Sequence, residues 1–264
     1  MPRRRLDAEL VRRGLAGNAA EAAAAVVEGS VTVGGGPASN PAALVSPDEA
    51  VHLLTGGRRF VSRGGDKLAA ALIAFRVDAA GRDALDAGAS TVGFTDCLLQ
   101  EGAARVIAVD VGYGQLAWSL RTDPRVVLME RTNVRDLDRS TLAFVPDLVV
   151  ADLSFVSLVG VVHDLVSLAA RDADLLLLVK PQFEVPAADV PRGGVVDDPA
   201  MRRRAVERVA SACRTAGAGT LAVMTSPIAG RAGNVEYLLH ARVGAAGGAD
   251  LAWATPNPAG DGDA

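Results

Sequence analysis

Cysteine, histidine and aromatic residues are all scarce in this 264-residue sequence. The two cysteines, Cys97 and Cys213, lie far apart and form neither a CxxC nor a Cys/His pattern, and there are only three histidines. The sequence therefore predicts no zinc or other metal site, and we interpret both cysteines as buried, reduced thiols. Aromatic residues make up 4% of the chain, so its core has to consist mainly of Ala, Val and Leu.

Long apolar runs and a strong positive charge are also missing. No segment reaches the roughly 18 apolar residues that a membrane-spanning helix requires. The basic N-terminus lacks the apolar core of a signal peptide, because Asp7 and Glu9 interrupt it. We therefore predict a cytoplasmic protein that does not bind membranes. The net charge of -4 argues against a uniformly basic nucleic-acid binder, so contact with RNA requires a local cluster of arginines.

Four segments of the chain differ in composition. We predict a small α+β module over residues 1–57, an interdomain linker over 58–63, an α/β domain over 64–244 and a disordered tail over 245–264. The prediction for the tail rests on its richness in Gly, Ala, Pro and Asp, which offer little large apolar surface to bury.

The first module combines helix signals with arginines. Residues 7–13 form a predicted helix that ends at Gly14. Asn18 caps a second helix that extends to Val27, and residues 30–34 alternate like a strand. The predicted RNA contacts are the arginines of this module and one that precedes the α/β domain: Arg3, Arg4, Arg5, Arg12, Arg13 and Arg63. The alternative is a solvated surface helix with a basic tail.

The α/β domain shows seven strand-like apolar runs, with helix-compatible segments between most of them. The predicted strands span residues 82–86, 105–110, 125–130, 147–152, 174–180, 220–225 and 235–243. Strands that alternate with helices form a mostly parallel, Rossmann-like sheet with helices on both faces. Because ligands bind such sheets at the carboxyl ends of the strands, the polar residues that end these runs are candidate site residues.

A glycine-centred turn directly follows the first of these strands. Asp86 ends the strand, and Gly88 allows a tight turn and the close approach of a ligand. The pattern is neither the GxGxxG of dinucleotide sites nor a Walker motif. An acidic residue before a single glycine-centred turn favours S-adenosylmethionine, because a carboxylate can neutralise the ammonium group of that cofactor. A purely structural turn is the alternative.

Polar residues also lie at or near the ends of the next two strands. Asp110 is placed to accept hydrogen bonds from both hydroxyls of a nucleoside ribose, and Asn133 is placed to meet an adenine edge. Three successive strand ends with matching chemistry predict a nucleoside cofactor. The predicted cofactor-binding residues are Asp86, Gly88, Ala89, Ser90, Thr91, Gly93, Phe94, Asp110, Asn133 and Asp152.

Four ionisable residues lie at informative places. Asp152 and Lys180 end two strands, and Lys67 lies just before the sheet begins. Glu236 starts the last strand, so it reaches the same edge of the sheet if that strand runs antiparallel to the others. Each residue alone is consistent with a surface charge, but together they predict a catalytic cluster.

Lys67, Asp152, Lys180 and Glu236 match the Lys-Asp-Lys-Glu tetrad of the FtsJ/RrmJ-type ribose 2′-O-methyltransferases. The segments VSRGGDKL, LDAGAS, DVGYGQL, DLVVADLSF, LVKPQFE and GNVEY resemble the TlyA family more closely still, across nearly all of residues 3–243. This resemblance implies an S4-type RNA-binding domain followed by a class I methyltransferase fold. It also implies S-adenosylmethionine-dependent 2′-O-methylation of cytidines in ribosomal RNA, on one or both ribosomal subunits, with the tetrad as the catalytic residues.

The sequence departs from the family pattern at three places. Val92 stands where the family usually has glycine, which predicts an altered cofactor affinity. Asn18 and Ala19 stand where members commonly have a polar residue followed by arginine, which predicts a weaker grip on RNA. Phe60 stands where a mycobacterial-type linker has tryptophan. These departures leave an inactive RNA-binding assembly factor as an alternative, beside a haemolysin and a small-molecule methyltransferase.

The sequence leaves two roles open for Lys180. As a neutral amine it would accept the proton of the ribose 2′-hydroxyl during attack. As a charged group it would stabilise the developing alkoxide while water takes the proton. Neither route needs a metal, and on both we predict that Lys180→Ala abolishes turnover and leaves cofactor binding largely intact.

Overall fold

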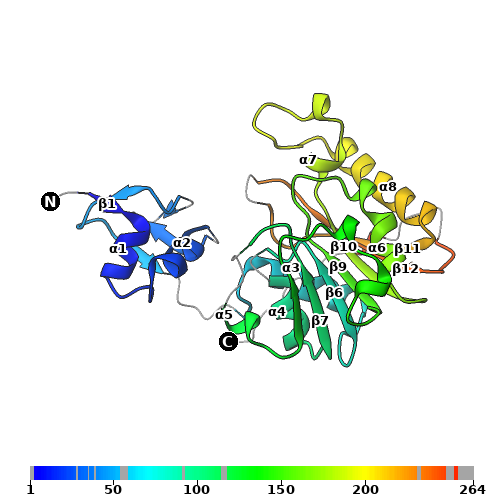
Figure 1. Ribbon diagram of the computed structural model, residues 1–264. Coiled ribbons are helices and arrows are strands. Elements are labelled where there is room, and N and C mark those ends of the chain that lie inside the picture. Colours follow the sequence, from blue (N-terminus) through cyan, green and yellow to red (C-terminus); the bar gives the residue numbers. More distant parts are fainter. Residues whose placement is uncertain are drawn as a thin grey trace, which may run out of the picture. The chain divides into compact units, whose positions relative to one another are not determined.

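The computed structural model describes residues 3–27, 29–34, 36–38, 40–53, 59–90, 93–113, 118–230, 233–247 and 253–254. The chain forms two compact units, Met1–Arg58 and Arg59–Ala264 (Figure 1). Our predictions for Thr91 and Val92, and for most of the segment 245–264, lie outside the described residues.

The N-terminal unit is a small α+β domain, as predicted. Its elements are β1 (Arg4–Arg5), α1 (Leu6–Arg12), α2 (Ala19–Val27), β2 (Val31–Val33), β3 (Gly36–Pro37), β4 (Leu44–Val45) and β5 (Val51–Leu53). Strands β3, β2 and β5 form an antiparallel sheet in that order, and β1 pairs with β4. The two helices pack on a core that belongs to this unit alone and contains Leu6, Leu10, Ala22, Val26, Val31, Val45 and Val51.

Local sequence signals fix the ends of both helices in this unit. Gly14 has a φ of 69°, a left-handed conformation that glycine adopts without strain and that stops the chain from continuing as α1. The Asn18 side-chain oxygen accepts a hydrogen bond from the Glu21 amide at 2.9 Å, which caps the first turn of α2. The Glu21 carboxylate accepts in turn from the Gly17 amide at 2.8 Å. The predicted stop at Gly14 and the predicted cap at Asn18 are confirmed.

The second unit is built on one eight-stranded sheet. Its strands are β6 (Asp83–Ala87), β7 (Arg105–Val109), β8 (Val126–Met129), β9 (Leu148–Ala151), β10 (Asp174–Val179), β11 (Ala218–Thr225), β12 (Tyr237–Val243) and β13 (Trp253–Ala254). The order across the sheet is β13-β11-β12-β10-β9-β6-β7-β8. Strands β6 to β10 pair in parallel, whereas β12 runs antiparallel to both β10 and β11. The seven predicted strands and the mostly parallel Rossmann-like sheet are confirmed.

Helices cover both faces of this sheet (Figure 1). They are α3 (Arg63–Phe75), α4 (Gly93–Gln100), α5 (Trp118–Arg121), α6 (Val162–Leu168), α7 (Pro181–Glu184) and α8 (Pro199–Thr215). The buried residues of β10 alternate between two cores, one shared with α6 and α8 (Leu175, Leu177, Val179) and one shared with α3 and α4 (Leu176, Leu178). Successive side chains of a strand point to opposite faces, so this uninterrupted apolar run fits a strand covered on both sides.

The structure departs from the predicted disordered tail at Trp253 and Ala254. These two residues form β13, which pairs in parallel with β11 at the edge of the sheet. The ring of Trp253 lies edge-on to that of Tyr237, with 5.7 Å between the ring centroids. This aromatic contact gives the short strand an anchor that its length alone does not provide.

The segment 59–63 is not a free linker. Phe60 is 2% exposed and packs in the core with α3 and α4. The Val61 amide donates a hydrogen bond to the Asp96 carboxylate at 2.7 Å. The predicted linker is therefore too long at its C-terminal end, because Phe60 contributes apolar surface that the second unit buries.

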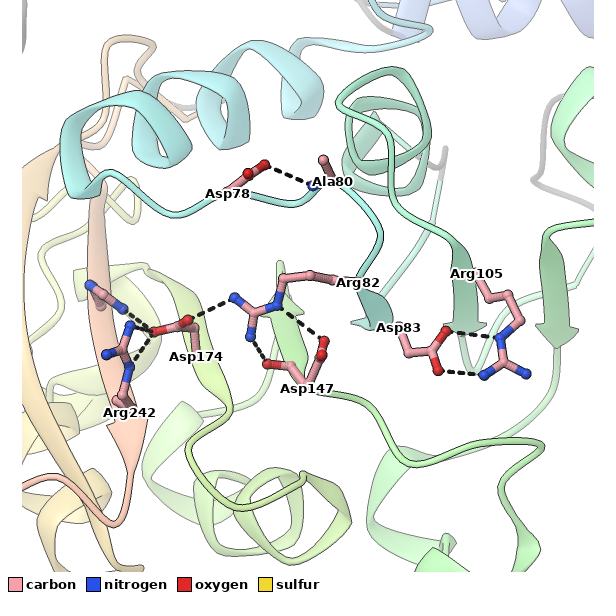
Figure 2. A network of polar contacts seen from close by, with 9 residues as sticks. Asp78, Ala80, Arg82, Asp83, Arg105, Asp147, Asp174 and Arg242 are labelled. Atoms are coloured by element: carbon pink, nitrogen blue, oxygen red, sulfur yellow. Dashed lines mark hydrogen bonds and ion pairs between the residues drawn. The ribbon is translucent and has the colours of Figure 1, made fainter.

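A charged network lies at the amino ends of the strands, opposite the edge that carries the candidate site residues (Figure 2). Asp174 begins β10 and accepts hydrogen bonds from Arg82 at 2.7 Å and Arg242 at 2.8 Å, and it lies 2.7 Å from His240 Nε2. Burial alone raises the pKa of Asp174, but the contacts with His240, Arg82 and Arg242 lower that pKa below its ordinary value. Arg82 also binds Asp147, so the network joins β10 and β12 to the residues that precede β6 and β9.

Neither a membrane span nor a metal-binding group is found among the described residues. No described helix is long and apolar enough to cross a membrane, and no three described His, Cys, Asp or Glu side chains are grouped to hold a metal ion. Cys97 and Cys213 are buried free thiols, as predicted. Burial raises the pKa of both thiols, which makes them poor nucleophiles.

Candidate active site

The whole chain contains two lysines, and both lie at the carboxyl edge of the sheet. Lys67 is 9% exposed and Lys180 is 8% exposed. All the other residues of the chain with a permanent positive charge are arginines. Lysine differs from arginine in offering a compact point charge with three donors instead of a planar fork. Its use at these two buried positions indicates chemistry directed at a single atom.

Lys180 directly follows β10 and forms an ion pair with Asp152, which directly follows β9. The distance from Lys180 Nζ to Asp152 Oδ1 is 2.6 Å. The same Nζ donates a hydrogen bond to Ser154 Oγ at 2.8 Å. Strands β9 and β10 are parallel neighbours with Leu177 beside Ala151. The charged residues therefore meet because the chain leaves both strands on the same side.

Lys67 lies in α3 and forms the second ion pair of the site. Its Nζ donates a hydrogen bond to Glu236 Oε2 at 2.5 Å, and Glu236 is 3% exposed. Because β12 runs antiparallel to β10, with Tyr237 opposite Val179, Glu236 reaches the edge where Lys180 lies. Glu236 lies one residue before β12 begins, at the edge where the antiparallel strand was expected to bring it. The structure thus brings the four predicted catalytic residues to one edge of the sheet as two ion pairs.

Asp86 is completely buried at the end of β6. Its Oδ2 accepts a hydrogen bond from Thr95 Oγ1 at 2.7 Å, whereas its Oδ1 has no hydrogen-bond partner among the described residues. Burial raises the pKa of Asp86 to about 7. The hydrogen bond from Thr95 lowers this pKa, whereas the nearby carboxylates of Asp152 and Asp110 raise it further. An unpaired buried carboxylate oxygen is costly, and a cationic ligand group would satisfy it.

Gly88 brings the turn after β6 against the residue that follows β9. Its φ is +83°, and a Cβ at this position would lie 2.8 Å from the main-chain oxygen of Asp152. Both the positive φ and the lack of space for a Cβ therefore require glycine at this position. The Asp152 amide donates a hydrogen bond to the Ala87 oxygen at 3.1 Å, and Ala89 is buried behind the turn. The candidate cofactor loop and Asp152 are thus fixed to each other.

Asp110 follows β7, and two main-chain amides hold its carboxylate. The Ser90 amide donates to Oδ2 at 2.8 Å and the Gly112 amide donates to Oδ1 at 2.6 Å. A carboxylate oxygen has two acceptor sites, so this arrangement orients the group and still permits hydrogen bonds from ligand hydroxyls. Ser90 has a φ of 43°, which is uncommon for a residue other than glycine and typical of ligand-binding loops.

Asn133, Gly93 and Phe94 have structural contacts of their own. The Asn133 side-chain oxygen accepts a hydrogen bond from the Arg135 amide at 3.1 Å and caps a 3₁₀ turn over Val134–Asp136. A Cβ on Gly93 would lie 2.1 Å from Ser62 Oγ, so this glycine allows α4 to approach the start of α3. Phe94 is 3% exposed in the core beneath the same helices. The last two residues therefore hold together the helix pair that carries Lys67.

Glu9 organises the arginines of the N-terminal unit. Its buried carboxylate lies 2.6 Å from Arg12, 2.8 Å from Arg13 and 3.7 Å from Arg4. Hydrogen bonds from Arg12 and Arg13 lower the pKa of Glu9 to about 2. Three guanidinium groups therefore gather around one carboxylate, which leaves net positive charge at this place.

The structure distinguishes two kinds of predicted RNA contact. Arg13 donates to the main-chain oxygens of Pro47 at 2.9 Å and Glu49 at 3.0 Å, and 20% of its side chain is exposed. Its guanidinium is therefore engaged in holding the N-terminal unit together. The other predicted contacts of this unit are exposed residues: Arg3, Arg4, Arg5 and Arg12. Arg63 opens α3 in the second unit and is half-buried.

Sequence reasoning missed three residues beside the tetrad. Ser154 accepts a hydrogen bond from Lys180, and Phe155 next to it is 92% exposed with a φ of 63°. Asn234 is buried and ties down the chain after α7, since its side chain binds the Gly194 oxygen and the Val196 amide at 2.8 and 2.9 Å. The sequence signal that could have indicated them is their position. Ser154 and Asn234 lie two residues from Asp152 and Glu236, and Phe155 directly follows Ser154.

Comparison with known proteins assigns both units. The FtsJ-like methyltransferase model matches residues 60–243, and the S4 domain model matches residues 4–51. Together with the two ion pairs at the sheet edge, these matches define a methyltransferase that carries an N-terminal S4 domain. More specifically, the chain belongs to the TlyA family of methyltransferases.

Three relatives illustrate the family. The 16S/23S rRNA (cytidine-2'-O)-methyltransferase TlyA of Mycobacterium tuberculosis is 54% identical over 241 residues, which are 91% of this chain and 90% of that protein. Hemolysin A of Brachyspira hyodysenteriae is 33% identical over 237 residues, 89% of this chain and 98% of that protein. A solved structure described as a hemolysin from Streptococcus thermophilus has a TM-score of 0.72 at 33% identity, and covers 96% of this chain and 91% of that chain.

Proposed function

We propose that this chain is an S-adenosylmethionine-dependent methyltransferase that modifies the ribose 2′-hydroxyl of a cytidine in ribosomal RNA. The observation that carries the proposal is the arrangement of two lysine–carboxylate pairs, Lys180–Asp152 and Lys67–Glu236, beside the turn at Asp86. The relative with 54% identity, which is named as an rRNA (cytidine-2'-O)-methyltransferase, supports the choice of substrate.

The turn after β6 fits S-adenosylmethionine. The Asp86 Oδ1 atom, buried without a described partner, suits the ammonium of the amino acid part of this cofactor. The oriented carboxylate of Asp110 suits the two ribose hydroxyls. When bound, the cofactor supplies an electrophilic methyl group on a sulfonium centre.

Lys180 is the residue that we assign to the reacting hydroxyl. A ribose 2′-hydroxyl is a weak nucleophile, so the protein has to orient it and to stabilise the negative charge that develops on its oxygen. Asp152 and Ser154 fix Lys180 Nζ on two sides. Of the two possible roles, the charged one is favoured, because a carboxylate at 2.6 Å stabilises the ammonium form. Charged Lys180 donates a hydrogen bond to the hydroxyl oxygen, and the proton passes to water.

The RNA contacts are assigned to arginines of both units and to one exposed aromatic ring. Arg3, Arg4, Arg5 and Arg12 in the S4 domain, and Arg63 at the start of α3, are suited to backbone phosphates. The exposed ring of Phe155 follows Ser154, the partner of Lys180, and offers a face on which an unpaired base can stack.

Methyl transfer to ribosomal subunits tests this proposal. The purified full chain is incubated with methyl-labelled S-adenosylmethionine and with small or large subunits that lack the modification. The proposal predicts label in ribosomal RNA at one cytidine whose ribose resists alkaline cleavage. A matched RNA with 2′-deoxycytidine at that position should accept no label. Label on a base, or no label on either subunit while the cofactor binds, would contradict the proposal, and absent cofactor binding would favour the inactive assembly factor.

A further inference from the structure

Glu184 is a buried carboxylate to which the proposed reaction gives no role. It is 2% exposed and ends α7, the short helix that begins immediately after Lys180. Both of its carboxylate oxygens accept hydrogen bonds from the chain that follows β9. Ser157 Oγ donates to Oε2 at 2.5 Å, and the Leu158 amide donates to Oε1 at 2.8 Å. Burial raises the pKa of Glu184, so the protein bears a cost for placing this group here.

The chain that Glu184 holds is the loop that contains Asp152 and Ser154. This loop, residues 152–157, connects β9 to a 3₁₀ turn over Leu158–Gly160. Within it Phe155 has a φ of 63°, a left-handed conformation that costs energy for any residue except glycine. A loop of this shape persists only if contacts outside it impose the conformation. The two hydrogen bonds from its far end to Glu184 are contacts of that kind.

The other side of Glu184 is anchored as well. Arg208 in α8 donates a hydrogen bond to the main-chain oxygen of Glu184. The ring of the preceding residue, Phe183, packs against Phe155 with 5.4 Å between the ring centroids. The segment that starts at Lys180 is therefore fixed both to α8 and to the loop. Glu184 is the residue that joins these two attachments, to α8 through its main-chain oxygen and to the loop through its carboxylate.

We infer that Glu184 is a positioning residue, which locks the loop 152–157 to the segment that begins at Lys180. Its function is to keep Asp152 and Ser154 aligned with Lys180 Nζ while it touches none of the reacting groups. This inference rests on the proposed function for its kinetic consequence. Its structural consequence, an ordered loop, does not depend on the identity of the substrate.

Substitutions at Glu184 and Ser157 separate a positioning role from simple packing. Glutamine can still accept from the Leu158 amide and can donate to Ser157 Oγ, so Glu184→Gln should keep most of the activity. Glu184→Ala loses both contacts and should lower kcat about tenfold or more, because misalignment of a catalytic group carries penalties of this order. Ser157→Ala loses one contact and should give an intermediate loss. Glu207→Ala, at an exposed carboxylate of α8, is the matched control and should change nothing.

Two readouts are measured on the full chain. The first is the split between kcat and KM for RNA, with cofactor Kd as a check: Glu184→Ala should lower kcat and leave KM and Kd within about twofold. The second is amide hydrogen exchange over residues 153–160, which should become faster in Glu184→Ala and stay slow in Glu184→Gln.

The outcomes distinguish this inference from the proposed function. If the wild-type chain methylates no ribosomal RNA, the proposed function fails, and the exchange data still decide whether Glu184 orders the loop. The inference is overturned if Glu184→Ala keeps wild-type kcat and slow exchange. It is also overturned if Glu184→Gln is as impaired as Glu184→Ala, since the charge would then matter in place of the two hydrogen bonds. If Glu184→Ala does not fold, Ser157→Ala decides by the same criteria.

Discussion

Lys180 Nζ lies 2.6 Å from Asp152 Oδ1, although neither residue belongs to a strand. Each is the first residue beyond a strand, and the two strands are parallel neighbours in register at Leu177 and Ala151. The ion pair is thus a direct consequence of the sheet: once β9 and β10 align, their charged successors emerge side by side at its carboxyl edge. The same alignment places Ser154 within hydrogen-bonding distance of Lys180.

The protonation state of Lys180 can be read directly, because the chain contains two lysines. Nuclear magnetic resonance of protein labelled with ¹⁵N-lysine should show two side-chain signals, and Lys67→Arg should assign them by removing one. We expect the Lys180 signal to be that of a charged ammonium at neutral pH, because Asp152 lies 2.6 Å away. A neutral amine at Lys180 would instead support its role as the proton acceptor.

Cofactor affinity should depend on pH through Asp86. The pKa of this carboxyl is raised to about 7 by burial, so it is protonated and neutral below that pH. Only the ionised form attracts the ammonium of the cofactor, and the affinity measured by calorimetry should therefore fall as the pH drops from about 7.5 to about 6. Asp86→Asn should bind weakly at every pH in this range. Asp110→Asn should bind weakly but keep the pH dependence, and an Asp86→Asn variant that keeps it would refute the assignment.

The arginines of the S4 domain should divide into two classes. Arg3→Ala removes an exposed side chain, so it should weaken RNA binding and reduce the slope of log affinity against log salt by about one. Arg13→Ala removes the donor to the Pro47 and Glu49 carbonyls, so it should lower the melting temperature instead. Filter binding at several salt concentrations and thermal unfolding measure the two effects. Equal loss of affinity at unchanged stability in both variants would contradict the division.

The network around Asp174 should contribute more to the free energy of unfolding than the nearby exposed ion pair between Asp83 and Arg105 (Figure 2). Asp174→Ala leaves Arg82, His240 and Arg242 without their buried carboxylate, so the free energy of unfolding should fall by about 3 kcal/mol or more. Asp83→Ala removes an ion pair with Arg105, whose side chain is 50% exposed, and should cost less than about 1 kcal/mol. Urea unfolding of both variants gives the comparison.

The sign of the accompanying pH effect follows from the lowered pKa of Asp174. Its stabilisation is fully present above the ordinary carboxyl pKa of 3.8 and is lost as the pH falls toward the lower folded-state pKa. Wild-type protein should therefore lose stability in acid more steeply than Asp174→Ala. Parallel loss of stability in the two proteins, or similar cost for Asp174→Ala and Asp83→Ala at neutral pH, would show that the network contributes little.

The sequence predicted the sheet because each strand carries its own signal. The run over β10 is apolar throughout and ends at a lysine, and Glu236 could be placed at the same edge once an antiparallel last strand was considered. No such signal exists for β13, since two residues show no periodicity and Trp253 is held by its contact with Tyr237. The sequence does not reveal that Phe60 belongs to the second unit, because its burial depends on contacts with α3 and α4.

The sequence predicts the site residues that lie at strand ends, but not those that lie in the loops and short helices after them. Strand ends are visible in sequence as a polar residue after an apolar run, as at Asp86, Asp152 and Lys180. Ser154 and Glu184 act through contacts that join residues 26 and 27 positions apart, and such contacts exist only when loops from two strands meet. The same limit applied to Arg13, whose partners are main-chain oxygens of another segment.

The most direct test of this account separates methyl transfer from cofactor binding at Lys180. Single-turnover methyl transfer to ribosomal subunits and calorimetric cofactor affinity are measured for wild type, Lys180→Ala and Lys180→Arg. The account predicts that Lys180→Ala binds the cofactor within about twofold of wild type and transfers methyl groups at least about 10²-fold more slowly. Lys180→Arg keeps the charge but not the compact donor, so it should also fail. Full turnover by Lys180→Ala would contradict the central assignment.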